Sequence, residues 1–385
     1  MHFTEEHDFF RQSFRDFLQK EAVPHIEKWE ESGTIDKEIW KKMGEMGYFG
    51  ISYPEKYGGL DLDIFYLVIY LEELQRVNSG GFAAAMWVHP YLAMTHVLAE
   101  GSDAIKERYL PASISGELMG CLCISEPFGG SDVSGMRTTA VLEGDHYIIN
   151  GSKTFITNGV YSDYLVVAAK TDPAARSKGI SMFIMDRDTP GISATKLDKL
   201  GWRASDTGEI AFDNVRIHKD QLLGEKGQGF GYLMQHLALE RLIMAVNAHA
   251  RSEWALEYTI QYMKDRQAFG TTIDKFQALR HKIADLAAEV EMCKTFNYET
   301  ARKLGKKEYV VKEASMAKLV STRVSDQVAY DCLQMLGGYG YMEEYPLARN
   351  LRDSRLGPIG GGTSEILREI IAKMVIDGKE YKPAT

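Results

Sequence analysis

The sequence is poor in cysteine. Its 385 residues contain four, at Cys121, Cys123, Cys293 and Cys332. Four cysteines in a chain of this length do not make a disulfide framework, and their spacing fits no zinc-binding pattern. We therefore expect no metal site and a reducing compartment.

Long apolar runs and a basic excess are also absent. No uncharged apolar run approaches the roughly 18 residues needed to span a membrane. Lys and Arg number 45 against 54 Asp and Glu, and the net charge of −9 argues against nucleic acid and anionic membranes as partners. Because Glu5, Glu6 and Asp8 lie in the first turns, we expect neither a signal peptide nor an Arg-rich transit sequence, and a cytoplasmic location.

The periodicity of apolar residues divides the chain into three parts. Residues 1–118 are predicted to be helical, residues 119–227 to form short, mainly antiparallel strands, and residues 228–385 to form long helices. This order excludes a βαβ nucleotide-binding fold and predicts an α+β protein in three parts. Many unrelated functions remain possible for such an architecture.

Local signals add four expectations. Pro111 is expected to break a helix, and Asn150-Gly151 to form a turn between two strands. The small, apolar residues 80–86 suit either close helix packing or contact with a ligand tail. Polar stretches at 302–308 and 337–345 are expected to separate the last helices.

A glycine-rich segment, CISEPFGGSD at residues 123–132, opens the predicted β part. Ser125 supplies a hydroxyl, Gly129-Gly130 allow the backbone to approach a flat ring closely, and Ser131 and Asp132 offer polar contacts. A glycine-rich turn entering a strand explains the segment equally well when it is considered alone.

Together with QMLGGYGYMEEYPLARNLRD at residues 334–353, this segment and the α–β–α order resemble the acyl-CoA dehydrogenase family along the whole chain. The long-chain members are most alike, and the isovaleryl- and citronellyl-CoA dehydrogenases are also similar. The resemblance implies an α+β fold with an N-terminal helical domain (1–118), a central β barrel (119–227) and a C-terminal four-helix bundle (228–385). It also implies FAD, an acyl-CoA substrate, electron-transferring flavoprotein as acceptor and a homotetramer.

The resemblance also assigns cofactor contacts. In the family, the hydroxyl matching Thr157 bonds the flavin N5 that receives the hydride, and Phe155 replaces the usual Trp while keeping an aromatic face. The arginine matching Arg266 pairs with the FAD pyrophosphate and, like segment 334–338, reaches a neighbouring subunit's flavin. Without the family, Thr157 would be an exposed residue on a core strand and Arg266 a solvated helix end. The implied cofactor positions are Leu122, Ser125, Ser131, Phe155, Thr157, Arg266, Phe269, Gln277, Gln334, Gly337, Gly338, Thr363 and Glu365.

The catalytic base is expected to have moved. Medium- and short-chain members carry a glutamate where this chain has Gly361, whereas long-chain and isovaleryl members place it in a Glu-Arg-Leu sequence on a helix. Glu240-Arg241-Leu242 matches that sequence, so Glu240 is the predicted base. Independently, Glu240 lies on an apolar helical stripe, where burial would raise its pKa toward the 6–7 common for a general base. The alternative is a buried ion pair with Arg241 or another cation.

Three residues are predicted to contact the substrate: Ser131, which matches a serine beside the pantetheine arm, Arg241 and Gly361. The Gly361 N–H would hydrogen-bond the thioester carbonyl, and the missing side chain would admit a longer or bulkier acyl group.

The resulting prediction is FAD-dependent α,β-dehydrogenation of an acyl-CoA, medium- to long-chain or branched, to a trans-2-enoyl-CoA. Two alternatives remain open. One is an acyl-CoA oxidase or flavin monooxygenase on the same fold, and the other is a catalytically silent protein that binds an acyl thioester.

Overall fold

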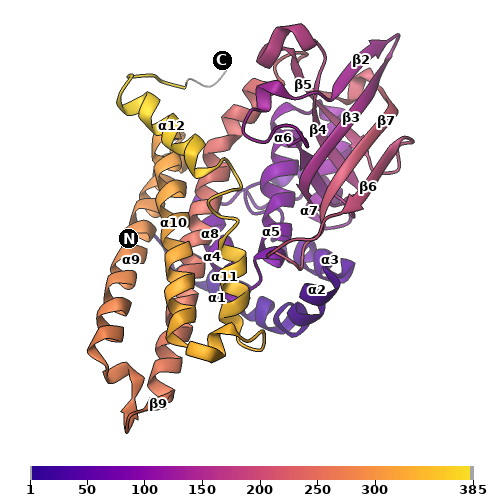
Figure 1. Cartoon of the computed structure of the whole chain (residues 1–385). Helices are drawn as coiled ribbons and strands as arrows, with labels where there is room; N and C mark the ends of the chain where they lie inside the picture. Colours follow the sequence, from indigo (N-terminus) through magenta and orange to yellow (C-terminus); the bar gives the residue numbers. More distant parts are fainter. Residues whose placement is uncertain (1, 382–385) are drawn as a thin grey trace.

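The computed structural model describes residues 2–381 and is drawn in Figure 1. The N-terminal part is helical, with α1 (Glu5–Glu21), α2 (Ile26–Ser32), α3 (Lys37–Glu45), α4 (Ile64–Arg76), α5 (Gly80–Val88), α6 (Met94–Glu100) and α7 (Asp103–Ile114). Helix α1 begins at a capping box formed by Thr4 and His7, and it buries Phe14 and Leu18, which lie four residues apart on one face.

Pro111 does not break a helix, contrary to the prediction, because it lies inside α7. Its missing N–H costs one helical hydrogen bond, but Tyr109, Leu110 and Ile114 on the same helix are buried against the core. Tertiary packing therefore outweighs the local preference. Of the two readings for residues 80–86, close packing is confirmed, since a Cβ on Gly80 would approach the Trp202 and Arg251 side chains to 2.6 Å.

The middle part is one eight-stranded sheet. Its strands are β1 (Gly120–Cys123), β2 (Thr139–Glu143), β3 (His146–Thr157), β4 (Tyr164–Lys170), β5 (Ile180–Asp186), β6 (Ile192–Lys196), β7 (Thr207–His218) and β8 (Leu222–Leu223). The order is β6-β7-β3-β2-β4-β5-β8, and β1 pairs in parallel with β4. Only the pair Thr139–Lys170 joins β2 to β4, so the sheet folds at this point into two halves.

Strand β4 is buried along its whole length because both of its faces are covered. Val166 and Ala168 pack with residues of α6 and α7, whereas Leu165 and Val167 pack with Ile149 and other residues of the opposite half-sheet. The two halves thus enclose an apolar core of their own, and the helices cover one outer face (Figure 1).

The expected turn at Asn150-Gly151 is wrong, because β3 continues through it. The register of β3 against β7 shifts between Ile149 and Gly151, which marks a bulge, and again between Lys153 and Ile156. A glycine with φ of 144° at position 151 allows the first irregularity without ending the strand.

The C-terminal part contains α8 (Gly229–Asp265), α9 (Gln277–Gly305), α10 (Val311–Met335), α11 (Pro346–Ser354) and α12 (Ser364–Val375). A small hairpin, β9 (Gln267–Ala268) and β10 (Thr271–Thr272), joins α8 to α9 at the tip of the bundle (Figure 1). The break between helices predicted at 302–308 starts only after Gly305, because α9 extends to that residue. Helix α8 packs against α9 and α10 of the bundle and also against α4. Some of its side chains therefore belong to the core of the N-terminal part. Among residues 2–381, no helix combines the length and apolar character that crossing a bilayer requires. The exact domain boundaries, between residues 118 and 119 and between residues 227 and 228, stay predictions.

Candidate active site

Glu240 lies on α8 with only 9% of its surface exposed. Burial raises its pKa to about 7, although the charges of His236 and Arg241 act in the opposite direction. No hydrogen bond or ion pair within residues 2–381 engages its carboxylate; Arg241 donates instead to the Ser315 hydroxyl on α10, at 3.3 Å. The structural ion pair that was the alternative for Glu240 is therefore not formed in this structure.

Gly361 lies against the same stretch of α8. A Cβ built on it would meet Met244 Cγ at 3.4 Å, and Met244 follows Glu240 by one helical turn. Gly361 and Gly362 have φ angles of 63° and 92°, the left-handed region that favours glycine. Among the described residues, the Gly361 N–H finds no hydrogen-bond acceptor, so it is free to donate to a ligand.

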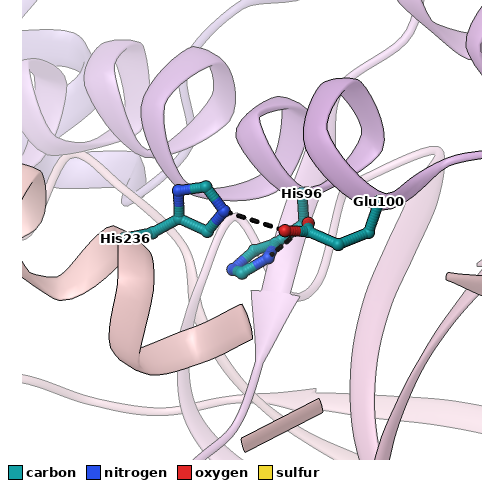
Figure 2. A group of neighbouring side chains, drawn as sticks. All are labelled: His96, Glu100 and His236. Atoms are coloured by element: carbon teal, nitrogen blue, oxygen red, sulfur yellow. Dashed lines mark hydrogen bonds and ion pairs between the residues drawn. The ribbon is translucent and has the colours of Figure 1, made fainter. Parts of the chain in front are cut away.

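One helical turn before Glu240, His236 belongs to a cluster of two histidines and a carboxylate, which Figure 2 shows. His236 contacts Glu100 Oε1 through Nε2 at 3.0 Å, and His96 contacts Oε2 through Nδ1 at 3.1 Å. These histidine contacts hold the pKa of Glu100 below its ordinary value although burial acts to raise it, and burial lowers the pKa of His96. The three ligand atoms are close enough to hold a metal ion, but buried His96 Nε2 has no hydrogen-bond partner in the described part of the chain. A metal-ligating histidine normally donates its other N–H, so we interpret the cluster as a hydrogen-bond network.

The predicted flavin contacts on the sheet come together around β3. Phe155 lies at the second bulge with a φ of 60°, and 72% of its surface is exposed. The Ser125 carbonyl accepts from the Thr154 N–H at 2.9 Å, which places the glycine-rich segment beside Phe155. Within residues 2–381, the hydroxyls of Ser125, Ser131 and Thr157 make no hydrogen bond. An exposed aromatic ring on strained backbone, flanked by unused hydroxyls, fits the face and polar edge of a flavin.

Six of the remaining predicted contacts form a second group at the bundle tip. The Arg266 guanidinium lies over the Tyr339 ring, 5.4 Å from its centroid, which brings Arg266 beside the 3₁₀ helix Gly337–Tyr341. Phe269, in the hairpin, is 97% exposed, and a Cβ on Gly337 or Gly338 would meet nothing within 4 Å. This tip, near the label β9, is far from β3 in Figure 1, so one chain does not bring the two groups together. Gln277 and Gln334 are exposed members of this second group.

Three predicted positions have other roles in the structure. The Leu122 side chain is buried in the core, so any contact with FAD would use its backbone. The Thr363 hydroxyl caps α12 by accepting from the Ile366 N–H, and Glu365 pairs with Arg368 at 3.1 Å. Sequence reasoning missed Lys318 and the cluster of His96, Glu100 and His236. The i, i+4 spacing of His96 with Glu100, and of His236 with Glu240, was a signal that could have indicated the cluster.

Three family models cover most of the chain: the acyl-CoA dehydrogenase N-terminal domain (residues 4–117), middle domain (121–215) and C-terminal domain (227–376). The long-chain specific acyl-CoA dehydrogenase of Sus scrofa is 40% identical over 380 residues, 98% of this chain and 88% of that protein. The isovaleryl-CoA dehydrogenase of Pongo abelii is 38% identical over 375 residues, 96% and 88% of the two chains. The acyl-CoA dehydrogenase structure from Geobacillus kaustophilus superposes with a TM-score of 0.95 at 41% identity, covering 97% of this chain and 99% of that one.

The chain therefore belongs to the acyl-CoA dehydrogenase family, and the predicted fold class is confirmed. It is an oxidoreductase acting on acyl-CoA in fatty-acid or branched-chain acyl-CoA metabolism. Its cofactor is FAD, as in other members of the family. The free hydroxyls and exposed ring around β3 fit this group.

Proposed function

We propose that the protein converts an acyl-CoA thioester to its trans-2-enoyl-CoA, with Glu240 as the base. The observation that supports this role most directly is a buried carboxylate with no hydrogen bond or ion pair among residues 2–381, one turn from the helix face next to Gly361. Burial without a partner is costly for a carboxylate and raises its pKa into the range that suits a general base.

In this reaction Glu240 takes the proton from the α carbon of the acyl group. The Gly361 N–H donates to the thioester carbonyl and stabilises the negative charge that develops on its oxygen. The electron pair of the broken α C–H bond forms the new C=C bond, and the β hydrogen departs with its own electron pair as hydride, for which FAD, when bound, would be the acceptor. Thr157 supplies a hydroxyl donor and Phe155 an aromatic face beside the ring.

The proposed substrate is a medium- to long-chain or branched acyl-CoA. The long-chain and isovaleryl relatives support this range, as does Gly361, whose missing side chain leaves space facing Met244. Electron-transferring flavoprotein is the proposed acceptor. A cytoplasmic location, and the lack of nucleic-acid partners, stay predictions from the sequence.

We also propose that the protein is a homo-oligomer. Tetramers are typical of the family. The bundle tip with Arg266 and the group of residues around Phe155 on β3 are separate in one chain (Figure 1). A second copy would therefore have to supply the tip to complete a flavin site. Arg266→Ala should lower flavin occupancy without changing the mass of the oligomer. Loss of flavin would support a shared site, and unchanged occupancy would refute this role of Arg266.

The test of the proposed reaction is anaerobic bleaching of the flavin absorbance. The purified protein is mixed with straight-chain acyl-CoAs of increasing length, isovaleryl-CoA and citronellyl-CoA. Bleaching that is greatest with one length or branch type would support dehydrogenation and identify the substrate class. Rapid oxygen consumption with peroxide release would favour an oxidase or monooxygenase. Colourless protein that takes up no flavin would indicate a silent binding protein.

A further inference from the structure

Lys318 on α10 is a buried cation that the proposed reaction does not yet use. Its side chain is fully buried, and its ammonium donates to the Gly362 carbonyl at 2.6 Å. Among the described residues it has no carboxylate within ion-pair distance. A buried ammonium held by a single carbonyl uses one of its three donors and is costly to desolvate. Such an arrangement contributes little to stability by itself, because an apolar side chain would fill the same space without the free energy of desolvating a charge.

The carbonyl that Lys318 holds belongs to a segment with little rigidity of its own. Residues 360–362 are three consecutive glycines, and two of them have positive φ. Glycine has the largest conformational freedom of all residues, so fixing this segment requires outside contacts. The Thr363 cap on α12 fixes its far end, and the Gly360 N–H bonds to the Leu356 carbonyl at 2.9 Å at its near end.

The segment also runs along one face of α10. A Cβ on Gly357 would meet Thr322 at 3.1 Å, and Gly362 meets Lys318, which precedes Thr322 by one turn of the same helix. Gly361 lies between this anchor and the Met244 side chain of α8. The Ser364 N–H also donates to the Pro358 carbonyl at 2.9 Å, and within the segment that this bond closes, Lys318 is the side chain that ties the residue next to Gly361 to α10.

We propose that Lys318 is a positioning residue for the reaction: its hydrogen bond to Gly362 holds the Gly361 N–H where the thioester carbonyl binds. This inference rests on the proposed function. Misplacement of a donor by about 1 Å can cost on the order of a hundredfold in rate. Lys318 need not contact the substrate, because it acts through the backbone of the glycine segment.

Lys318→Met tests the proposal, because it keeps the length of the side chain and removes its donors. Amide hydrogen exchange of residues 359–366 in the FAD-loaded protein should become about tenfold faster, since the segment loses its anchor. The rate of anaerobic flavin reduction by the preferred acyl-CoA should fall about 10- to 100-fold, with a smaller change in KM. The long-wavelength absorbance of the complex with a 3-thia-acyl-CoA, which reports stabilised negative charge on the thioester, should also weaken.

Two further variants separate positioning from general damage to α10. Lys318→Gln retains a shorter donor and should recover part of the reduction rate. Cys332→Ala, a fully buried change further along α10, should lower stability but leave the segment's exchange and the 3-thia-acyl-CoA absorbance unchanged.

Unchanged hydrogen exchange in Lys318→Met would refute the anchor. Faster exchange with an unchanged reduction rate would leave Lys318 a structural residue and refute its positioning role. If the wild-type flavin is reduced by no acyl-CoA, the proposed function itself fails and the positioning role fails with it. The exchange data would still show whether the anchor exists, so the two failures are distinguishable.

Discussion

Replacing Glu240 by Gln should make the protein more stable at pH 8 while removing its activity. The folded state holds the Glu240 proton up to a pKa of about 7, against an ordinary value of 4.5. Its contribution to folding is therefore complete below pH 4.5 and is lost as the pH rises through 7. At about 1.36 kcal/mol per pH unit, the difference corresponds to about 3 kcal/mol of strain at pH 8 from the ionised, buried carboxylate.

Gln has the shape of Glu without its charge, so Glu240→Gln should recover up to about 3 kcal/mol of unfolding free energy at pH 8 and little at pH 4.5. Flavin reduction by acyl-CoA should fall about 10²- to 10⁴-fold, the usual contribution of a positioned base. Denaturant unfolding at the two pH values and stopped-flow reduction on the same preparations measure both effects, with flavin occupancy as a check on folding.

Glu253→Gln is the matched control on the same helix. Glu253 pairs with Lys294 at 2.7 Å and is partly exposed, so this change should lower stability by about 1 kcal/mol or less and leave turnover unchanged. Near-native activity in Glu240→Gln would refute Glu240 as the base. A loss of stability at pH 8 would show that Glu240 serves a structural ion pair after all.

Three further predictions concern other residues. His236→Gln should move the rise of kcat/KM with pH to higher pH, because the His236 charge lowers the pKa of Glu240; a pH profile that does not move would contradict this coupling. Gly361→Glu should shift the substrate preference toward shorter acyl chains. It should also lower the free energy of unfolding by about 1–2 kcal/mol, because the φ of 63° at this position is unfavourable for a residue with a Cβ. Gly361→Ala should lower stability equally without a comparable shift in chain-length preference. Glu72→Gln should lower the unfolding free energy by about 3 kcal/mol at pH 7 and much less near pH 2. The reason is that contacts with His249, Arg11 and Tyr298 overcome the effect of burial and hold the pKa of Glu72 at about 2, so its stabilisation is lost as the pH falls toward that value. Equal losses at both pH values would refute this account.

The cofactor and base predictions were accessible from the sequence because their signals are local. The segment at 123–132 and Phe155 with Thr157 are each short and contiguous, and the structure joins them through one hydrogen bond between Ser125 and Thr154. Glu240 was predicted as the base because Glu240-Arg241-Leu242 matches the family's sequence, and the apolar helical stripe around it, which is a local property, predicted its burial. The burial of Glu240 follows from that stripe and agrees with the structure, whereas the stripe alone left an ion pair with Arg241 or another cation open.

The sequence by itself determined the α–β–α order, the glycine-rich segment at 123–132 and the buried carboxylate, since each depends on residues within a few positions of one another. Only the tertiary structure decided that Pro111 stays helical, that Asn150-Gly151 is a bulge, and that Lys318 meets Gly362, 44 residues away along the chain. It also decided that Glu100 and His236, 136 residues apart, share a hydrogen bond one helical turn from Glu240. The physical reason is that these outcomes depend on packing between distant segments, whose free energy exceeds the local preferences that a sequence pattern records.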